Sequence, residues 1–242
     1  MPPSIAAHAT IVPIERLQLD YQPAPWPFAE RHRAEIDAWF ADRQRKNPAL
    51  WNGLVLMLAR HEIAGSVFRG SFIPVDYASF RAWHDRGHPE TGVRDSFAAG
   101  VLRATDGAFL LGLMSARTAN AGRIYFPCGT PDLNDVIGAT VDLDGSVRRE
   151  VAEETGLTPS DYDADPGWIT VLQGPHIAHM KLLRLREQAS TLRDRILGVL
   201  ARQHEPELSD IRIVRGPADL DPRMPAFVVS FLHHVWARRD GA

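Results

Sequence analysis

The segment Gly145-Ser-Val-Arg-Arg-Glu-Val-Ala-Glu-Glu-Thr-Gly-Leu157 carries three glutamates, at positions 150, 153 and 154. On an α-helix, which turns by about 100° per residue, their carboxylates share an arc of about 100°. Each pair of like charges at these spacings costs about 0.2–0.5 kcal/mol even when exposed. A positive charge nearby would offset this repulsion. A hard divalent cation, which prefers oxygen ligands, is suited to bind the three carboxylates.

The rest of the segment also has the pattern of a helix packed on a sheet. Val147 and Val151 form an apolar stripe beside the glutamates, and Gly156 stands where a left-handed residue would end the helix. Arg149 is placed to pair with Glu153 at i,i+4 and to help orient it. The alternative interpretation is a solvated acidic helix face with no bound ligand.

Residues 149–157 resemble the second half of the Nudix signature, Arg-Glu-aliphatic-any-Glu-Glu-any-Gly-aliphatic, at every defined position. Upstream, Tyr125-Phe-Pro-Cys-Gly129 resembles the strand and turn that open the loop of that family. The resemblance covers residues 96–238 and implies an α/β fold, the Nudix-type α/β/α sandwich. In that fold a mixed β-sheet lies between helices, and the motif forms a loop, a helix and a loop.

The same resemblance implies a role for each matched residue. Glu153 and Glu154 would be the principal ligands of Mg²⁺ or Mn²⁺, and Glu150 would be a further ligand or the base that acts on water. Arg149 belongs to the catalytic set, and the carbonyl of Gly129 would complete the metal shell. The implied reaction is metal-assisted attack of water on one phosphorus of a diphosphate.

Two departures from the family pattern concern the loop before the helix. The first glutamate of the signature is replaced by Val141, and Gly129 precedes Arg149 by 20 positions, six more than in the family. A substitute acid would have to come from among Asp132, Asp135, Asp142 and Asp144. In addition, Cys128 replaces the first glycine of the turn.

Four further residues are candidates for the substrate side of the site. Glu205 and Glu207 lie in the late region where several Nudix enzymes supply another glutamate, with the alternative that both are surface acids. Arg117 and Arg123 flank the strand that leads into the loop and are candidates for phosphate contacts, with solvated or structural roles as the alternative.

Residues 1–94 are expected to form a small α+β N-terminal module that precedes a Nudix domain at 95–242. This module resembles, weakly, the N-terminal module of Nudix proteins that act on UDP-sugars. The pattern of the chain predicts strands at 11–20, 54–59, 66–72, 96–103, 108–114, 168–172, 177–185 and 210–214, and helices at 28–46, 76–84, 191–203 and 225–238. The helix with the three glutamates is expected between Asp142, a candidate N-cap, and Gly156.

The charge of the chain argues against one class of partner. Its 27 basic and 30 acidic residues give a net charge of −3, so no basic field exists to bind nucleic acid. A single cysteine, no signal peptide and no long apolar run lead us to expect a cytoplasmic protein that does not enter a membrane.

Together these patterns predict a metal-dependent hydrolase. It would cleave the pyrophosphate bond of a nucleoside diphosphate linked to another moiety, with a nucleotide sugar as one candidate. The alternative is a catalytically silent Nudix domain that binds a nucleotide as a sensor or as part of a complex. A homodimer is the expected assembly, with 225–238 packing either internally or between chains. The exact substrate, the number of metal ions and the general base stay open at this point.

Overall fold

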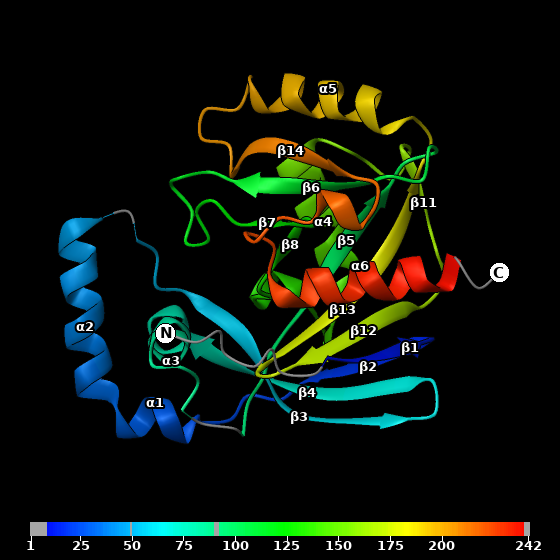
Figure 1. Ribbon diagram of the computed structural model, residues 1–242. Helices are drawn as coiled ribbons and strands as arrows, with labels where there is room; N and C mark the ends of the chain where they lie inside the picture. Colours follow the sequence, from blue (N-terminus) through cyan, green and yellow to red (C-terminus); the bar gives the residue numbers. More distant parts are fainter. Residues whose placement is uncertain (1–8, 49, 90–91, 240–242) are drawn as a thin grey trace. The chain divides into compact units, whose positions relative to one another are not determined.

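A computed structural model describes residues 9–48, 50–89 and 92–239 of the chain (Figure 1). Residues 1–8, from which we expect no signal peptide, lie outside this part. The contacts divide the chain into two units. The motif unit comprises 9–15, 97–129 and 144–239, and the N-terminal unit comprises 16–96 and 130–143.

The motif unit is built on a sheet with the strand order β1-β12-β13-β5-β6-β14, joined by the short strands β7, β8 and β11. Its elements are β1 (Thr10–Ile14), β5 (Asp95–Arg103), β6 (Phe109–Met114), β7 (Ile124–Tyr125), β8 (Cys128–Gly129), α4 (Leu143–Thr155), β11 (Tyr162–Ala164), β12 (Trp168–Gln173), β13 (His176–Leu185), α5 (Ala189–Leu200), β14 (Leu208–Val214), the 3-10 turn η2 (Pro217–Asp219) and α6 (Ala226–Arg239).

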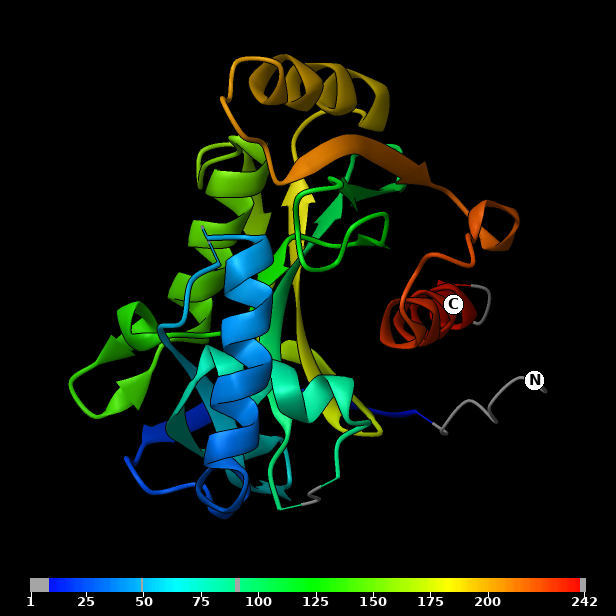
Figure 2. The ribbon, with the colours of Figure 1, turned by 90° about the vertical axis from the view of Figure 1, so that its left-hand side faces the viewer.

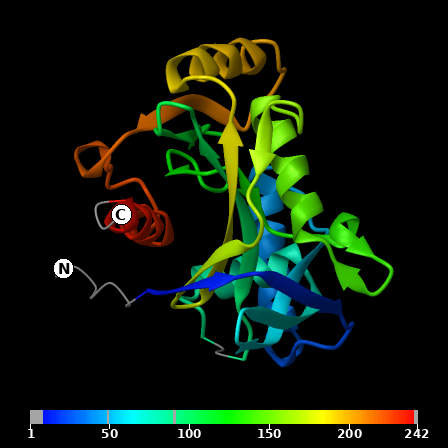
Figure 3. The same ribbon diagram turned by 90° about the vertical axis from the view of Figure 1, so that its right-hand side faces the viewer.

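Helices cover both faces of this sheet. α4 and α6 lie on opposite sides of β13 in Figures 2 and 3, which confirms the expected α/β class with helices on either side of a sheet. The apolar face of α6 packs within the unit, since Val228, Phe231 and Leu232 are buried and the Phe231 ring lies 5.8 Å from that of Phe126. This face is therefore occupied inside the chain.

The hairpin predicted around Thr105-Asp-Gly107 is confirmed. β5 and β6 pair antiparallel, and the N–H of Ala104 donates to the carbonyl of Ala108 at 2.9 Å. Gly107 adopts a φ of 79°, in the left-handed region that glycine enters without the penalty of a side chain.

The N-terminal unit has its own mixed sheet, in the order β3-β4-β2-β10-β9, with β2 and β4 parallel and the other pairs antiparallel. A buried cluster that includes Trp26, Phe28, Ile36 and Trp83 packs helices onto this sheet. The elements are β2 (Arg16–Tyr21), α1 (Pro27–Arg31), α2 (Arg33–Lys46), β3 (Leu54–Ala64), β4 (Val67–Asp76), α3 (Tyr77–Asp85), the 3-10 turn η1 (Leu133–Asp135), β9 (Val136–Ile137) and β10 (Thr140–Val141).

Two elements predicted as single turn out to be divided. The segment 11–20 forms β1 and β2, because β1 pairs with β12 whereas β2 pairs with β4 in the other sheet. The segment 28–46 forms α1 and α2, separated at His32, whose φ of −110° and ψ of 15° leave the helical region. Both breaks are set by pairing and packing with distant parts of the chain.

The lengthened loop after Gly129 belongs to the N-terminal unit. Its strands β9 and β10 form a small hairpin, and Thr140 pairs with Asp20 on β2. Pro131 accepts a hydrogen bond from the N–H of Leu56 at 2.7 Å. The six additional residues thus give this loop its own strands on the edge of a sheet. Within the described part of the chain, no helix is both long and apolar enough to cross a membrane.

Candidate functional site

Helix α4 carries the three glutamates and is held tightly on its sheet. Val147 and Val151 are buried, and a β-carbon added to Gly100 on β5 would lie 2.5 Å from Val151 Cγ2. The helix ends as expected at Gly156, which adopts a φ of 72°. Val147 and Val151 face β5. The glutamates therefore lie on the neighbouring arc of the helix surface, beside the face that packs against the sheet.

Glu154 is the most deeply buried acid of the motif, with 4 % of its surface exposed. The backbone N–H of Cys128 donates to its carboxylate, while Oε2 has no hydrogen-bond partner among the described residues. Burial raises the pKa of Glu154 well above its usual range, and the charges of Glu150 and Glu207 raise it further. A buried acceptor of this kind is costly unless another group satisfies it.

Glu150 lies against the turn that resembles the opening of the Nudix loop. Its side chain is 12 % exposed, and Arg149 Nη1 lies 2.6 Å from its Oε1. A β-carbon on Gly129 would be 2.6 Å from Glu150 Cδ, so only a glycine allows this approach. Burial raises the pKa of Glu150 to about 7; Arg149 opposes this effect, and the charge of Glu153 adds to it.

Glu153 is the outermost of the three acids, with 63 % of its side chain exposed. Its Oε2 lies 3.7 Å from Arg149 Nη1, so the pairing expected at i,i+4 is present. Arg149 therefore bridges two neighbouring carboxylates of α4.

The two late glutamates differ in their surroundings. Glu207 lies near enough to the motif for its charge to raise the pKa of both Glu150 and Glu154. Glu205, by contrast, pairs with Arg117 at 2.8 Å, and both side chains are more than half exposed. Arg123 lies exposed in the turn before β7. The charge of Glu207 thus acts on Glu150 and Glu154, while Glu205 and Arg117 pair with each other at the surface.

The replaced glutamate of the signature has no acid in its place. Val141 is 3 % exposed and pairs with Val136 across the β9–β10 hairpin. Asp132 and Asp135 are engaged in the capping box of η1. Asp144, finally, lies 3.1 Å from Lys181. Asp132, Asp135 and Asp144 therefore have local structural partners.

The donor set fits a hard divalent cation. Glu150, Glu153, Glu154 and Glu207 offer carboxylate oxygens, and the buried Glu154 Oε2 has no hydrogen-bond partner among the described residues. Mg²⁺ and Mn²⁺ favour such oxygen ligands, and a cation nearby would favour the ionised form of acids whose pKa burial raises. Glu150, Glu153 and Glu154, with the carbonyl of Gly129, are the residues that would hold the ion.

Tyr125, on β7, is a buried polar side chain three residues before Cys128. Tyr125 is 6 % exposed, and Asn120 Nδ2 donates to its hydroxyl at 3.1 Å. Burial raises the pKa of Tyr125, so the phenol stays neutral at physiological pH. Its buried ring packs as part of the core of the motif unit.

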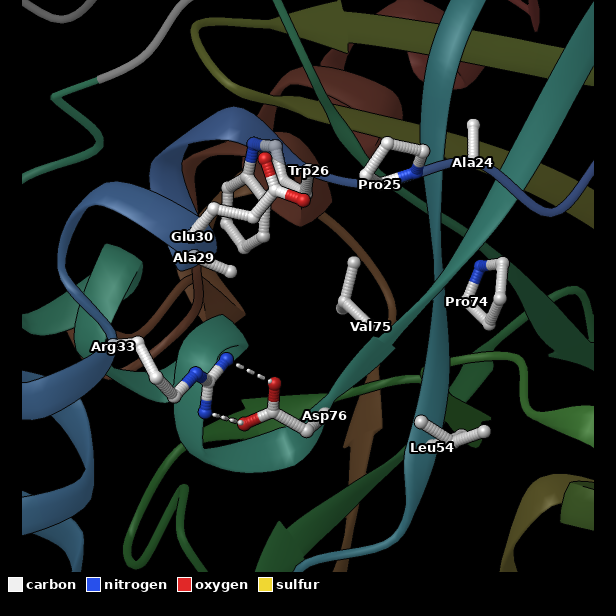
Figure 4. Close-up of a pocket in the computed structure, with 10 residues that line it drawn as sticks. All are labelled: Ala24, Pro25, Trp26, Ala29, Glu30, Arg33, Leu54, Pro74, Val75 and Asp76. Carbon is white, nitrogen blue, oxygen red and sulfur yellow. Dashed lines mark hydrogen bonds and ion pairs between the residues drawn. The ribbon is translucent and has the colours of Figure 1, made fainter.

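A separate cavity of about 570 Å³ lies in the N-terminal unit (Figure 4). Arg33 and Asp76 both line it and form an ion pair at 2.7 Å. Burial alone would raise the pKa of Asp76, but hydrogen bonds from Arg33 and Ser79 outweigh burial and hold the pKa below its usual range. None of the predicted site residues is among those that line the cavity, which are Ala24, Pro25, Trp26, Ala29, Glu30, Arg33, Leu54, Pro74, Val75 and Asp76.

No protein-family model matches the chain, and no curated protein matches it. Solved structures do match. A Nudix hydrolase from M. smegmatis is 16% identical, covers 61% of this chain and 87% of its own, and has a TM-score of 0.41. A Nudix hydrolase from Nitrosomonas europaea is 13% identical, with coverages of 60% and 89% and a TM-score of 0.38.

A third match is a bifunctional NMN adenylyltransferase/ADP ribose pyrophosphatase from Francisella tularensis, complexed with AMP and a manganese ion. It is 13% identical, covers 66% of this chain and 45% of its own, and has a TM-score of 0.40. The roles of residues in this chain therefore have to be argued from its own carboxylate site.

Proposed function

We propose that this chain is a hydrolase of the Nudix type, which uses a divalent cation to cleave the pyrophosphate bond of a nucleoside diphosphate linked to another moiety. One observation carries the proposal. Glu150 lies against Gly129, and the charges of Glu150, Glu153 and Glu207 act on the buried carboxylate of Glu154, whose Oε2 lacks a hydrogen-bond partner among the described residues. A solvated acidic face would have no reason to bury two of its acids.

The roles of the residues follow from their surroundings. A bound Mg²⁺ or Mn²⁺ would supply Lewis-acid stabilisation of the charge on the diphosphate oxygens. Glu153 and Glu154 bind the ion, and the N–H of Cys128 orients the carboxylate of Glu154. Glu150, whose carboxylate lies against Gly129, would be a further ligand or the base that accepts the proton of the attacking water. Arg149 holds the Glu150 carboxylate in place through Oε1.

The proposed hydrolysis forms one bond to phosphorus and breaks another. The water oxygen bonds to one phosphorus, the bond from that phosphorus to the bridging oxygen breaks, and two phosphate products leave. A nucleotide sugar is our leading candidate substrate, with the N-terminal unit helping to select it. The proposed partners are small molecules and not nucleic acid, in keeping with the net charge of −3. Cytoplasmic location and a homodimer are also part of the proposal.

The experiment that tests the proposal is a substrate panel. The purified chain is incubated with nucleotide sugars, ADP-ribose, dinucleoside polyphosphates, coenzyme A and nucleoside triphosphates, each with Mg²⁺ or Mn²⁺. We expect metal-dependent release of a nucleoside monophosphate from at least one linked diphosphate. No turnover of any substrate at high enzyme concentration would refute hydrolysis. Light scattering of the same sample measures the oligomeric state.

A silent nucleotide-binding domain is the second candidate, favoured by one specific observation. Val141 is buried where the signature has a glutamate, and the candidate substitutes Asp132, Asp135 and Asp144 have other partners. Calorimetric titration with the same panel separates the two functions, since a silent domain would bind a nucleotide without turning it over.

A further inference from the structure

Lys181, on β13, is a buried lysine in a chain that has only two lysines. It is 9 % exposed, and its Nζ lies 3.1 Å from Asp144 Oδ1 and 4.5 Å from the centre of the Trp168 ring. An ammonium group taken out of water is costly unless it is paired. The ion pair with Asp144 and the aromatic face of Trp168 offset that cost.

Asp144 stands at the start of the helix that carries the acids. It is the second residue of α4, where the helix dipole favours a negative charge. At about 100° per residue, Asp144 lies within about 60° of Val147 and Val151 around the helix axis, on the side packed against the sheet. The Lys181–Asp144 ion pair thus connects the first turn of α4 to β13. Val147 and Val151 pack the following turns of the helix against β5.

The site depends on how α4 is rotated about its axis. The Glu154 carboxylate has to reach the N–H of Cys128, and Glu150 has to lie against Gly129. A shift by one residue would turn the helix by about 100° and move both carboxylates away from β8. The Lys181–Asp144 ion pair adds a directional contact between α4 and β13 to the apolar packing of the two valines.

We infer that Lys181 and Asp144 are positioning residues, which fix the first turn of α4 so that Glu150 and Glu154 face the metal-binding side. The inference rests on the proposed function. The inference also assigns a role to Asp144. This acid pairs with Lys181 and does not take the place of the signature glutamate that Val141 replaces.

The test uses the whole chain and separates positioning from stability. Asp144→Asn alone leaves a buried ammonium without its carboxylate and risks unfolding. The main variant is therefore the double change Lys181→Met with Asp144→Asn, which removes both charges and so leaves no buried ammonium without a carboxylate. In the parent chain the Lys181 side chain is 11 % exposed and that of Asp144 is 48 % exposed. Asp144→Glu is the conservative variant. Asp163→Asn, which removes a carboxylate 2.9 Å from Arg186 in an exposed pair, is the matched control.

Four measurements are made on each variant: the Tm, amide hydrogen exchange of peptides that cover 144–155 without metal, Mn²⁺ binding by calorimetry, and steady-state kinetics. For the double variant we expect a Tm close to that of the parent chain and exchange about tenfold faster in the first turns of α4. Mn²⁺ affinity should fall about tenfold, and kcat should fall while KM changes little. Asp144→Glu and Asp163→Asn should match the parent chain.

Parental exchange and parental Mn²⁺ affinity in the double variant would overturn the positioning role while leaving the proposed function intact. Absence of Mn²⁺ binding in the parent chain would instead refute the proposed metal site, and with it any role in positioning that site. The two failures are therefore distinguished by the parent chain alone.

Discussion

The carboxylate of Glu150 occupies the space that a side chain on Gly129 would fill. A β-carbon at Gly129 would lie 2.6 Å from Glu150 Cδ and closer still to Oε1, which is nearer than real β-carbons approach other atoms. The glycine of the turn and the first glutamate of α4 therefore depend on each other, although 20 positions separate Gly129 from the start of the Arg-Glu motif.

Gly129→Ala is expected to displace the Glu150 carboxylate and to weaken Mn²⁺ binding by about tenfold, or about 1.4 kcal/mol. Gly198→Ala is the matched control, because Gly198 lies in the last turn of α5 and a β-carbon there would be 3.8 Å from its nearest neighbour, Arg202 Nη1. It should leave binding unchanged and raise stability by about 0.5–1 kcal/mol. Mn²⁺ titration calorimetry checks both variants, and equal affinity for both would contradict the contact.

Glu154→Gln should lower kcat/KM by about 10³-fold, or about 4 kcal/mol, because it removes a charged metal ligand. The amide oxygen can still accept the hydrogen bond from the N–H of Cys128, so the fold should be kept. At pH 8 without metal, the variant should be at least as stable as the parent chain, since a neutral amide replaces an acid that burial disfavours when charged. Steady-state kinetics and urea unfolding provide the two measurements, and a large loss of stability would mean a structural role.

The stability of the metal-free protein should fall as the pH rises. The pKa of Glu150 is raised from 4.5 to about 7, so the folded state binds a proton that the unfolded state has already released. This contribution is fully present below pH 4.5 and is lost by about pH 7, and it amounts to at most about 3 kcal/mol. Glu154 shifts in the same direction.

Urea unfolding in EDTA at pH 5 and pH 8 measures this dependence. Glu150→Gln should remove most of it, because an amide does not titrate. An identical pH dependence in the variant would show that Glu150 keeps an ordinary pKa in the folded state.

Glu207→Gln and Glu205→Gln form a matched pair of late substitutions. Glu207 influences the pKa of Glu150 and Glu154, so its loss should reduce kcat or Mn²⁺ affinity by about tenfold, or about 1.4 kcal/mol. Glu205 pairs with Arg117 at the exposed surface, and its loss should change neither. Kinetics at several Mn²⁺ concentrations checks both, and an effect confined to Glu205 would reverse the assignment.

Val141→Glu restores the residue of the family signature but should not raise activity. Val141 is 3 % exposed in the β9–β10 hairpin, and a carboxylate there has to be buried without a designed partner. We expect stability to fall by about 2–4 kcal/mol. Thermal unfolding and turnover measure the outcome, and a gain in activity would show that this position still faces the metal site.

The sequence alone determined the helix of α4, its apolar stripe and its glycine end, because these depend on residues within four positions of one another. It also determined the Thr105-Asp-Gly107 hairpin, whose signal is local. The three acids of the motif could be named for the same reason.

Only the tertiary structure decided how deeply those acids are buried and which residues they contact. The burial of Glu154, the contact of Glu150 with Gly129 and the effect of the Glu207 charge on both acids depend on strands far apart in the chain. The break between β1 and β2 and the pairing of the lengthened loop with β2 likewise follow from sheet partners. Periodicity reports which face of an element is apolar, whereas the neighbour that covers this face is set by packing between elements.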